Sequence, residues 1–353
     1  MKRRGTTTNP AGRFDVTQTE LFDDGWGVGP EALVDVKTRV FEEEARTIIT
    51  RNDSPDLPFD RSVNPYRGCE HGCVYCFARP SHSYLGHSPG LDFETMIYAK
   101  RNAARVLSNE LDKPGYRPET LVLGANTDPY QPIERRHELT RDILTVLLER
   151  KHPVSITTKA TSILRDLDIL QKMAADNLVH VFISAATLDQ HLSGKLEPRA
   201  AAPRRRLEVL NILKESGISV GLLCSPVIPG LTDFDIERVI QKGHEAGATV
   251  VGYSLLRLPH ELKQIFESWL NEHYPERAQK VLNLIRETRQ GKLNDSSFET
   301  RHSGAGVYAE MIRQRFDRIV EKLGLNQQTI RLNKHKFVGV SRPSKKRGQM
   351  PLF

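Results

Sequence analysis

Short apolar runs alternate with longer helical patterns from about residue 60 to residue 258, and this alternation restricts the possible folds strongly. Strands are predicted at residues 62–66, 120–125, 154–158, 179–185, 218–224 and 249–255. These runs of Val, Ile and Leu lack polar alternation, as expected of parallel strands buried on both faces. With a helix between successive strands, they predict a right-handed parallel sheet. Six units instead of eight predict an α/β fold, a partial (β/α)6 TIM-like barrel whose site lies at the carboxyl ends of the strands.

The helical patterns divide the chain further. Residues 134–149 space their apolar side chains three and four apart, and residues 162–174, 203–216 and 233–246 have similar patterns. Pro203 at the head of one pattern and Gly217 just past its end are typical of helix termini. Beyond residue 259 the pattern is mostly helical, at 261–269, 276–289 and 306–323. We therefore expect a flexible basic N-terminal arm (1–45), a barrel (46–258), a helical extension packed on it (259–330) and a basic tail (331–353).

The net charge of +7 belongs to the two ends of the chain. Four basic residues precede the first acid, residues 331–353 carry seven basic residues and no acid, and the remainder has a net charge of −4. Basic tails steer proteins towards polyanions such as nucleic acid, or serve as solvated linkers. No apolar run approaches the length of a membrane span, and no apolar segment follows the basic start. We therefore expect a cytoplasmic protein.

Three of the four cysteines, Cys69, Cys73 and Cys76, follow the first predicted strand on one tight loop. In the cytoplasm such clustering indicates metal instead of disulfides. Three thiolates on a [4Fe-4S] cluster leave one iron open, as a catalytic metal requires. Gly68 and Gly72 allow the backbone to wrap closely around it. The alternative is a zinc site completed by His71, His82 or His87, but no second Cys-x-x-Cys pair exists, and the spacing favours the cluster.

Cys-x₃-Cys-x₂-Cys with an aromatic residue, Tyr75, before the last cysteine resembles the signature of the radical S-adenosylmethionine (SAM) superfamily. The resemblance implies a [4Fe-4S] cluster whose open iron chelates the amino and carboxylate groups of SAM. One electron, from a donor such as flavodoxin or ferredoxin, then cleaves the sulfonium to a 5′-deoxyadenosyl radical.

Further strand ends resemble weaker features of this family in the same order. Residues 124–128 occupy the place of the glycine-rich motif that contacts the SAM amino group, and residues 225–230 resemble the adenine-binding turn. Ordinary readings remain open: a proline-punctuated turn, a solvated Lys159, and a surface ion pair between Glu197 and Arg199. The residues that the resemblance implies as SAM ligands are Tyr75, Gly124, Asn126, Thr127, Asp128, Thr158, Lys159, Ser184, Glu197, Arg199, Ser225 and Ile228.

Within the superfamily the chain is similar to the spore photoproduct lyase-like branch, also called DNA repair photolyase-like. The segments that carry the likeness are residues 64–69, 127–134, 197–199, 225–233 and 299–306. The likeness implies action on nucleic acid, in DNA repair or modification; modification of RNA or protein is the alternative. The lyase has a hydrogen-donor cysteine after its second strand, where this chain has Gly124-Ala125-Asn126. Cys224 is the only spare thiol, either a relocated donor or a buried core residue.

The chain ends in Gln-Met-Pro-Leu-Phe, which resembles the short peptide by which bacterial repair proteins dock on the DNA sliding clamp. The resemblance implies contacts from Gln349, Met350, Leu352 and Phe353. A chance pentapeptide is the alternative. A third possible function is therefore a non-catalytic, metal-stabilised adaptor bound to the clamp.

Overall fold

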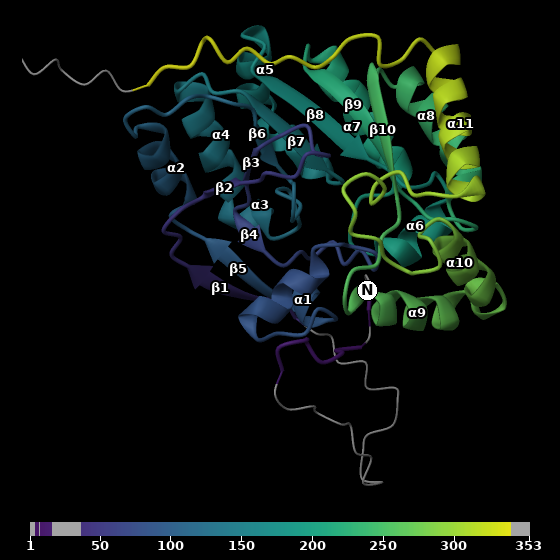
Figure 1. The fold of residues 1–353 in the computed structure, drawn as a ribbon. Helices are drawn as coiled ribbons and strands as arrows, with labels where there is room; N and C mark the ends of the chain where they lie inside the picture. The colour runs from purple at the N-terminus through teal and green to yellow at the C-terminus, as the bar shows by residue number, and fades with distance from the viewer. Residues whose placement is uncertain (1–3, 7, 16–36, 340–353) are drawn as a thin grey trace, which may run out of the picture.

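The computed structural model describes residues 4–6, 8–15 and 37–339, and its centre is one twisted sheet (Figure 1). The seven strands lie in the order β10-β9-β8-β7-β6-β3-β2. All neighbours pair in parallel except β2, which is antiparallel to β3. Among the described residues β10 and β2 do not pair with each other, so the predicted partial barrel is confirmed. The strands are β2 (Ile49–Arg51), β3 (Arg61–Val63), β6 (Leu121–Leu123), β7 (Val154–Thr158), β8 (Val179–Ser184), β9 (Ser219–Val227) and β10 (Val250–Leu255).

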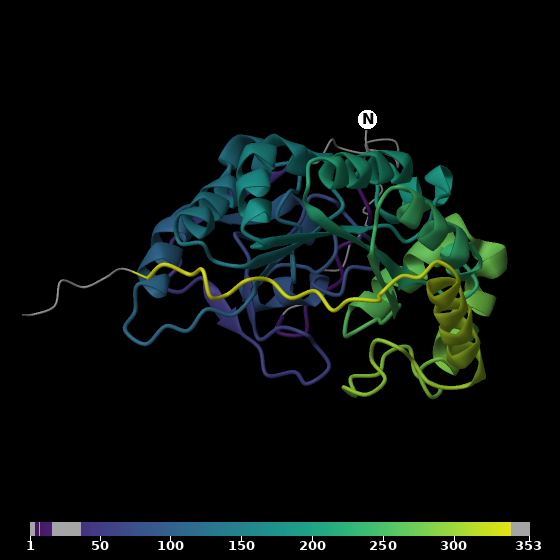
Figure 2. The same ribbon diagram turned by 90° about the horizontal axis from the view of Figure 1, so that it is seen from above.

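One face of the sheet is covered by helices (Figure 2). They are α2 (Ala103–Leu111), α4 (Leu139–Glu149), α5 (Leu167–Ala175), α7 (Pro203–Glu215) and α8 (Ile236–Glu245). Two shorter helices, α3 (Glu134–His137) and α6 (Gln190–Leu196), come after β6 and β8 in the chain. One predicted helix, 134–149, is divided: Glu138 has a left-handed φ of 52°, which ends α3 and begins α4. The break lets the buried Glu134 carboxylate accept hydrogen bonds from the Thr140 amide, at 3.1 Å, and from Tyr66.

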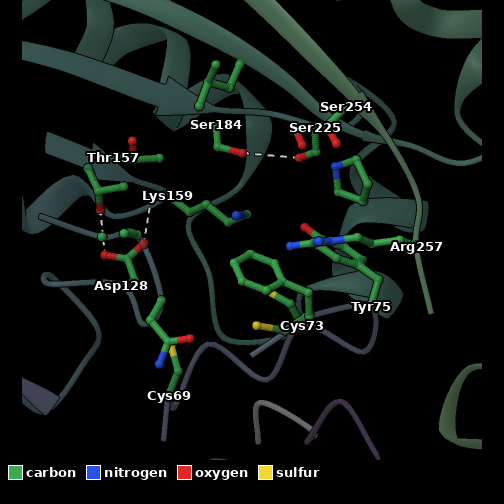
Figure 3. A pocket seen from close by; sticks show the side chains of 18 of the residues that line it. Cys69, Cys73, Tyr75, Asp128, Thr157, Lys159, Ser184, Ser225, Ser254 and Arg257 are labelled. Carbon is green, nitrogen blue, oxygen red and sulfur yellow. Dashed lines mark hydrogen bonds between the residues drawn. The ribbon is translucent and has the colours of Figure 1, made fainter. Parts of the chain in front are cut away.

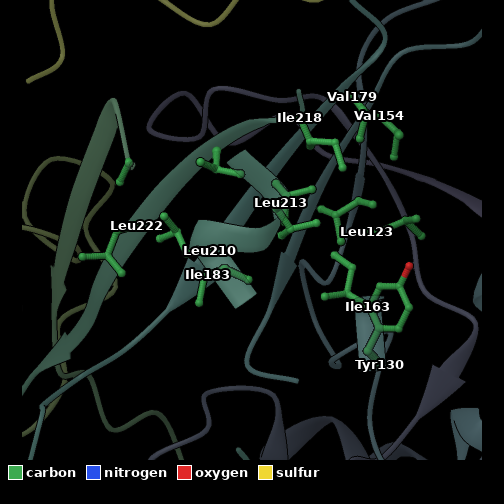
Figure 4. Close-up of a cluster of buried hydrophobic side chains, with 14 of the residues drawn as sticks. Leu123, Tyr130, Val154, Ile163, Val179, Ile183, Leu210, Leu213, Ile218 and Leu222 are labelled. Carbon is green, nitrogen blue, oxygen red and sulfur yellow. The ribbon is translucent and has the colours of Figure 1, made fainter. Parts of the chain in front are cut away.

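The main hydrophobic core lies between the sheet and these helices (Figure 4). Side chains of β8 and β9 meet the apolar face of α7 there. Burying each such side chain stabilises the fold by about 1.5–3 kcal/mol. The fully buried members include Leu123, Ile183, Leu210, Leu213 and Leu222.

The extension after the barrel packs on the cysteine loop. Its helices are α9 (Leu262–His273), α10 (Pro275–Glu287) and α11 (Val307–Lys322). The first two share a second hydrophobic cluster with Val74 and Tyr75, which lie between the cysteines. No helix in the described part of the chain is both long and apolar enough to cross a bilayer.

A small second sheet lies beside the barrel and includes part of the segment expected to be a flexible arm. In the order β1-β5-β4, its strands are β1 (Arg39–Glu43), β5 (Met96–Lys100) and β4 (Tyr66–Arg67). The sequence of β1, Arg-Val-Phe-Glu-Glu, has few apolar residues and so gives little strand signal. Parallel pairing with β5 satisfies its backbone and defines the strand.

Residues 4–6 and 8–15 also have a defined place, against the segment 79–94. The amides of Gly5 and Thr6 donate to the Glu94 carboxylate, at 2.8 and 3.1 Å. The Leu91 amide donates to the Thr8 carbonyl oxygen at 3.1 Å. This stretch lacks periodicity because it forms neither helix nor strand, and its backbone groups find partners in a loop instead. The described part of the expected arm is therefore packed.

The described part of the expected basic tail, residues 331–339, lies along the end of the sheet (Figure 1). Lys334 pairs with Glu119 at 2.8 Å, and Lys336 pairs with Asp176 at 2.6 Å. These two cations are thus neutralised by carboxylates of the barrel. The clamp-binding prediction for Gln349, Met350, Leu352 and Phe353 falls outside the described residues.

Candidate active site

A cavity of about 360 Å³ lies between the cysteine loop and the carboxyl ends of the barrel strands (Figure 3). Its floor is the loop, and its walls are the segments that follow β6, β7, β8, β9 and β10. The structure therefore brings together most of the side chains that were predicted from their position at the carboxyl ends of the strands. The predicted residues that line it are Cys69, Cys73, Tyr75, Cys76, Gly124, Asn126, Asp128, Thr158, Lys159, Ser184 and Ser225.

The cysteine loop is fixed by backbone hydrogen bonds to other elements. The Cys69 amide donates to the Phe93 carbonyl oxygen at 2.9 Å, and the Val74 amide to that of Leu196 at 3.0 Å. Gly68 has φ +79°, and a Cβ there would lie 2.8 Å from Ile97 Cδ1. Only glycine combines this φ with such a close approach, so the loop geometry depends on it.

Burial makes free thiolates costly at this loop. Cys69 and Cys73 are 7% and 8% exposed. Burial and then the charge of Asp128 raise the pKa of Cys69, and burial raises that of Cys73 against the nearby charge of Lys159. Since metals bind the thiolate form, a cationic partner such as cluster iron would offset this cost. An all-sulfur donor set facing one cavity fits an iron–sulfur cluster. Across the described ranges, no three His, Cys, Asp or Glu side chains gather as one metal ion would require.

Asp128 ties the cysteine loop to the ends of two strands. Its carboxylate accepts from the Thr158 hydroxyl at 2.7 Å and from the Lys159 amide at 2.8 Å, and lies 3.3 Å from His71 Nδ1. Burial would raise the pKa of Asp128, but these contacts, chiefly His71, hold it at about 2. The residue is therefore an ionised anchor that orients Lys159, whose ammonium group points into the cavity (Figure 3).

Glu197 and Arg199, predicted as SAM ligands, do not form the surface ion pair with each other that was the alternative reading. Glu197 pairs with Arg206 of α7 and accepts a hydrogen bond from the Tyr75 hydroxyl. Arg199 pairs with Glu70 of the cysteine loop at 3.1 Å. Since Glu197 is buried and does not line the cavity, it supports Tyr75 beneath the surface. Arg206 gave no sequence signal because it lies inside an ordinary helical pattern.

Three further predicted residues face away from the cavity. The Thr127 hydroxyl donates to the Tyr66 carbonyl oxygen at 3.1 Å. The Ile228 amide donates to Thr232 Oγ1 at 2.8 Å, and the side chain is buried. Cys224 belongs to the main hydrophobic core, while its neighbours on β9 line the cavity. Its thiol therefore packs in the core and does not line the cavity.

The sequence reasoning missed one wall of the cavity, formed after β10 and by the extension. Ser254 and Arg257 lie at the carboxyl end of the last strand, β10, where site residues of such a barrel are expected. His302 comes from an irregular segment of the extension, and its Nδ1 lies 3.2 Å from Ser254 Oγ. Phe77, next to the last cysteine, is 44% exposed at the same wall.

Comparison with known proteins gives three kinds of match. The profile of the radical SAM superfamily matches residues 63–243. An uncharacterised protein of Mycobacterium tuberculosis is 36% identical over 271 residues, which cover 76% of this chain and 76% of that protein. An uncharacterised protein of Methanocaldococcus jannaschii is 27% identical over 221 residues, 63% of this chain and 79% of its own. Spore photoproduct lyase complexed with dinucleoside spore photoproduct has the same fold: its TM-score is 0.59 at 14% identity, covering 80% of this chain and 79% of the lyase.

Proposed function

Because the chain belongs to the radical SAM superfamily, we propose that it holds a [4Fe-4S] cluster on Cys69, Cys73 and Cys76 and cleaves SAM reductively. When bound, the cluster supplies the electron that converts SAM into methionine and a 5′-deoxyadenosyl radical. The single observation that supports this proposal best is that all three cysteines line one cavity with the strand-end side chains.

The residues of the chain bind and orient SAM in this proposal. Lys159 offers its ammonium group to the SAM carboxylate, since it points into the cavity with its backbone fixed by Asp128. Ser184, whose hydroxyl donates to the Ser225 carbonyl oxygen at 3.2 Å, contacts the ribose in this proposal. A cavity of about 360 Å³ is within the range of small-molecule sites.

We propose nucleic acid as the substrate, in DNA repair or modification. The fold is shared with a lyase whose structure holds a dinucleoside photoproduct. A base would have to leave its stack to reach the cavity. Since Cys224 lies in the core and the other three cysteines are the proposed ligands, the chemistry proceeds without a cysteine hydrogen donor. A cytoplasmic location, an electron donor such as flavodoxin or ferredoxin, and clamp docking through residues 349–353 belong to the same proposal.

Anaerobic reconstitution tests it. The full chain is expected to bind about four irons and to form 5′-deoxyadenosine with SAM and dithionite. Cys69→Ala, Cys73→Ala and Cys76→Ala should each lose both properties, while the matched control Cys224→Ala keeps them. A wild-type protein that binds zinc, or binds iron without SAM cleavage, would contradict the enzymatic proposal. Stimulation of cleavage by RNA or peptide, and not by DNA, would replace the substrate.

A further inference from the structure

Arg257 enters the cavity from the side opposite to Lys159 (Figure 3). It follows the last barrel strand, β10, and shares its wall with Ser254 and His302. The cavity therefore carries two cations, one on each side. SAM has one carboxylate, for which Lys159 is the proposed partner. The second cation remains without an assigned ligand.

The guanidinium of Arg257 has no hydrogen bond or ion pair with any residue in the described part of the chain. The carboxylate whose charge acts on Arg257 is that of Asp56, but it already accepts hydrogen bonds from the Arg301 guanidinium at 2.5 and 2.6 Å. By contrast, the buried Arg289 donates to the carbonyl oxygens of Leu255 and Leu256. Burial and the charge of Arg301 lower the pKa of Arg257, yet an arginine stays protonated at neutral pH. A partly buried, unpaired cation is best compensated by an anion from a ligand.

Phe77 holds this guanidinium in place. The Arg257 Cζ atom lies 4.7 Å from the centroid of the Phe77 ring, a cation–π distance. The same pairing recurs nearby, where Arg301 Cζ lies 4.8 Å from the ring of Phe298, which is also exposed. Surfaces that bind single-stranded nucleic acid combine positive charge with exposed aromatic rings, as this wall does.

We propose that Arg257 binds a backbone phosphate of the nucleic-acid strand whose base enters the cavity, and that Phe77 is its positioning residue. This inference rests on the proposed function. The planar fork of arginine matches two phosphate oxygens at once, which an ammonium group does not. The alternative ligand, a carboxylate of a peptide substrate, is an outcome of the test below.

The experiment measures oligonucleotide affinity and SAM cleavage separately on reconstituted full-length protein. Arg257→Gln is expected to raise the Kd for single-stranded DNA about tenfold to a hundredfold. The association constant should also depend less on salt: the negative slope of log K against log salt concentration should become smaller in magnitude by about 0.7. The Kd of Arg257→Lys for DNA should lie between those of the wild-type protein and Arg257→Gln. Arg313→Gln on the outer helix α11 is the matched control, and it should leave the Kd for DNA, the salt dependence and SAM cleavage unchanged.

Phe77 is tested through the same affinity. Phe77→Leu should weaken DNA binding several-fold at unchanged iron content, because it removes the ring beneath Arg257. Phe77→Trp should restore the affinity, since it keeps an aromatic face. If Phe77 had a purely structural role, the Kd of Phe77→Trp for DNA would be as high as that of Phe77→Leu.

The outcomes separate this inference from the function itself. If wild-type protein forms no 5′-deoxyadenosine, both fail. If it forms 5′-deoxyadenosine and binds DNA, but Arg257→Gln binds DNA as tightly, only the inference fails. A raised KM for SAM with unchanged DNA affinity would assign Arg257 to SAM, and a loss of peptide binding in place of DNA binding would overturn the phosphate ligand.

Discussion

Replacing Glu94, which does not line the cavity, should destabilise the cysteine loop. Glu94 lies on α1 (Asp92–Thr95) and forms an ion pair of 2.5 Å with Arg79, and both side chains are 0% exposed. Its carboxylate also accepts from the Gly5 and Thr6 amides. Arg79 in turn donates to the Cys73 carbonyl oxygen at 2.9 Å. The pair therefore links the N-terminal segment, α1 and the proposed ligand loop.

The expected magnitude follows from this burial. Removing one partner of a buried ion pair costs about 3–5 kcal/mol, because the other charge is left uncompensated. Glu94→Gln keeps the size and removes the charge, so the full penalty on Arg79 applies. Glu310→Gln breaks an exposed pair with Arg313, with side chains 46% and 51% exposed, and should change the free energy of unfolding by about 0–1 kcal/mol.

Urea unfolding of the iron-free protein measures this, with the two variants compared at a common m value. The double variant Arg79→Met, Glu94→Gln should lose less stability than the sum of the single variants, by at least about 1 kcal/mol. Iron bound after anaerobic reconstitution should fall in Glu94→Gln and not in Glu310→Gln. A loss below about 1 kcal/mol in Glu94→Gln, or additive single effects, would refute the reasoning from the buried pair.

Three further predictions concern the core, acid stability and the site. Leu222→Ala should lower the free energy of unfolding by about 2–5 kcal/mol, measured by urea unfolding, since the side chain is fully buried. Burial lowers the pKa of His82, His152 and His180 from 6.5 to about 4. As the pH falls, protons therefore bind these histidines in the unfolded chain before they bind them in the folded one. The free energy of unfolding should fall between pH 6.5 and 4, by about 2 kcal/mol per histidine at pH 5. A urea midpoint of the iron-free protein that stays the same from pH 7 to pH 5 would contradict this. Asp128→Asn should raise the Kd for SAM about tenfold at unchanged iron content in anaerobic equilibrium binding, because the ionised anchor of Lys159 is lost.

The barrel could be predicted because its signals are local. Each buried parallel strand is an apolar run between a helix and a turn, and β7 has the predicted bounds, Val154–Thr158. Once the strands are in order, their carboxyl ends must meet at one edge of the sheet. This geometry is enough to predict that the cysteine loop, Asp128, Lys159 and Ser184 line one cavity, as they do.

The remaining features depend on contacts that no local pattern encodes. Glu197 finds Arg206, nine positions along the chain on the far side of a turn, instead of Arg199. Glu94 is an unremarkable acid in sequence and becomes a buried partner because Arg79 and two N-terminal amides converge on it. In both cases three-dimensional packing decides which charges meet.

The way the cations are satisfied separates the roles of residues that look alike in sequence. Arg79 and Arg206 are fully buried, and their guanidinium groups are used up by carboxylates and carbonyl oxygens of the protein itself. Lys159 and Arg257 reach the cavity, and in the described structure the protein offers their charged groups no such partner. Burying a charge without a partner is unfavourable, so a fold keeps such groups where a ligand completes them. We therefore expect the first pair of residues to serve stability and the second to serve binding, and ligand binding should stabilise the protein through contacts with the second pair and not with the first.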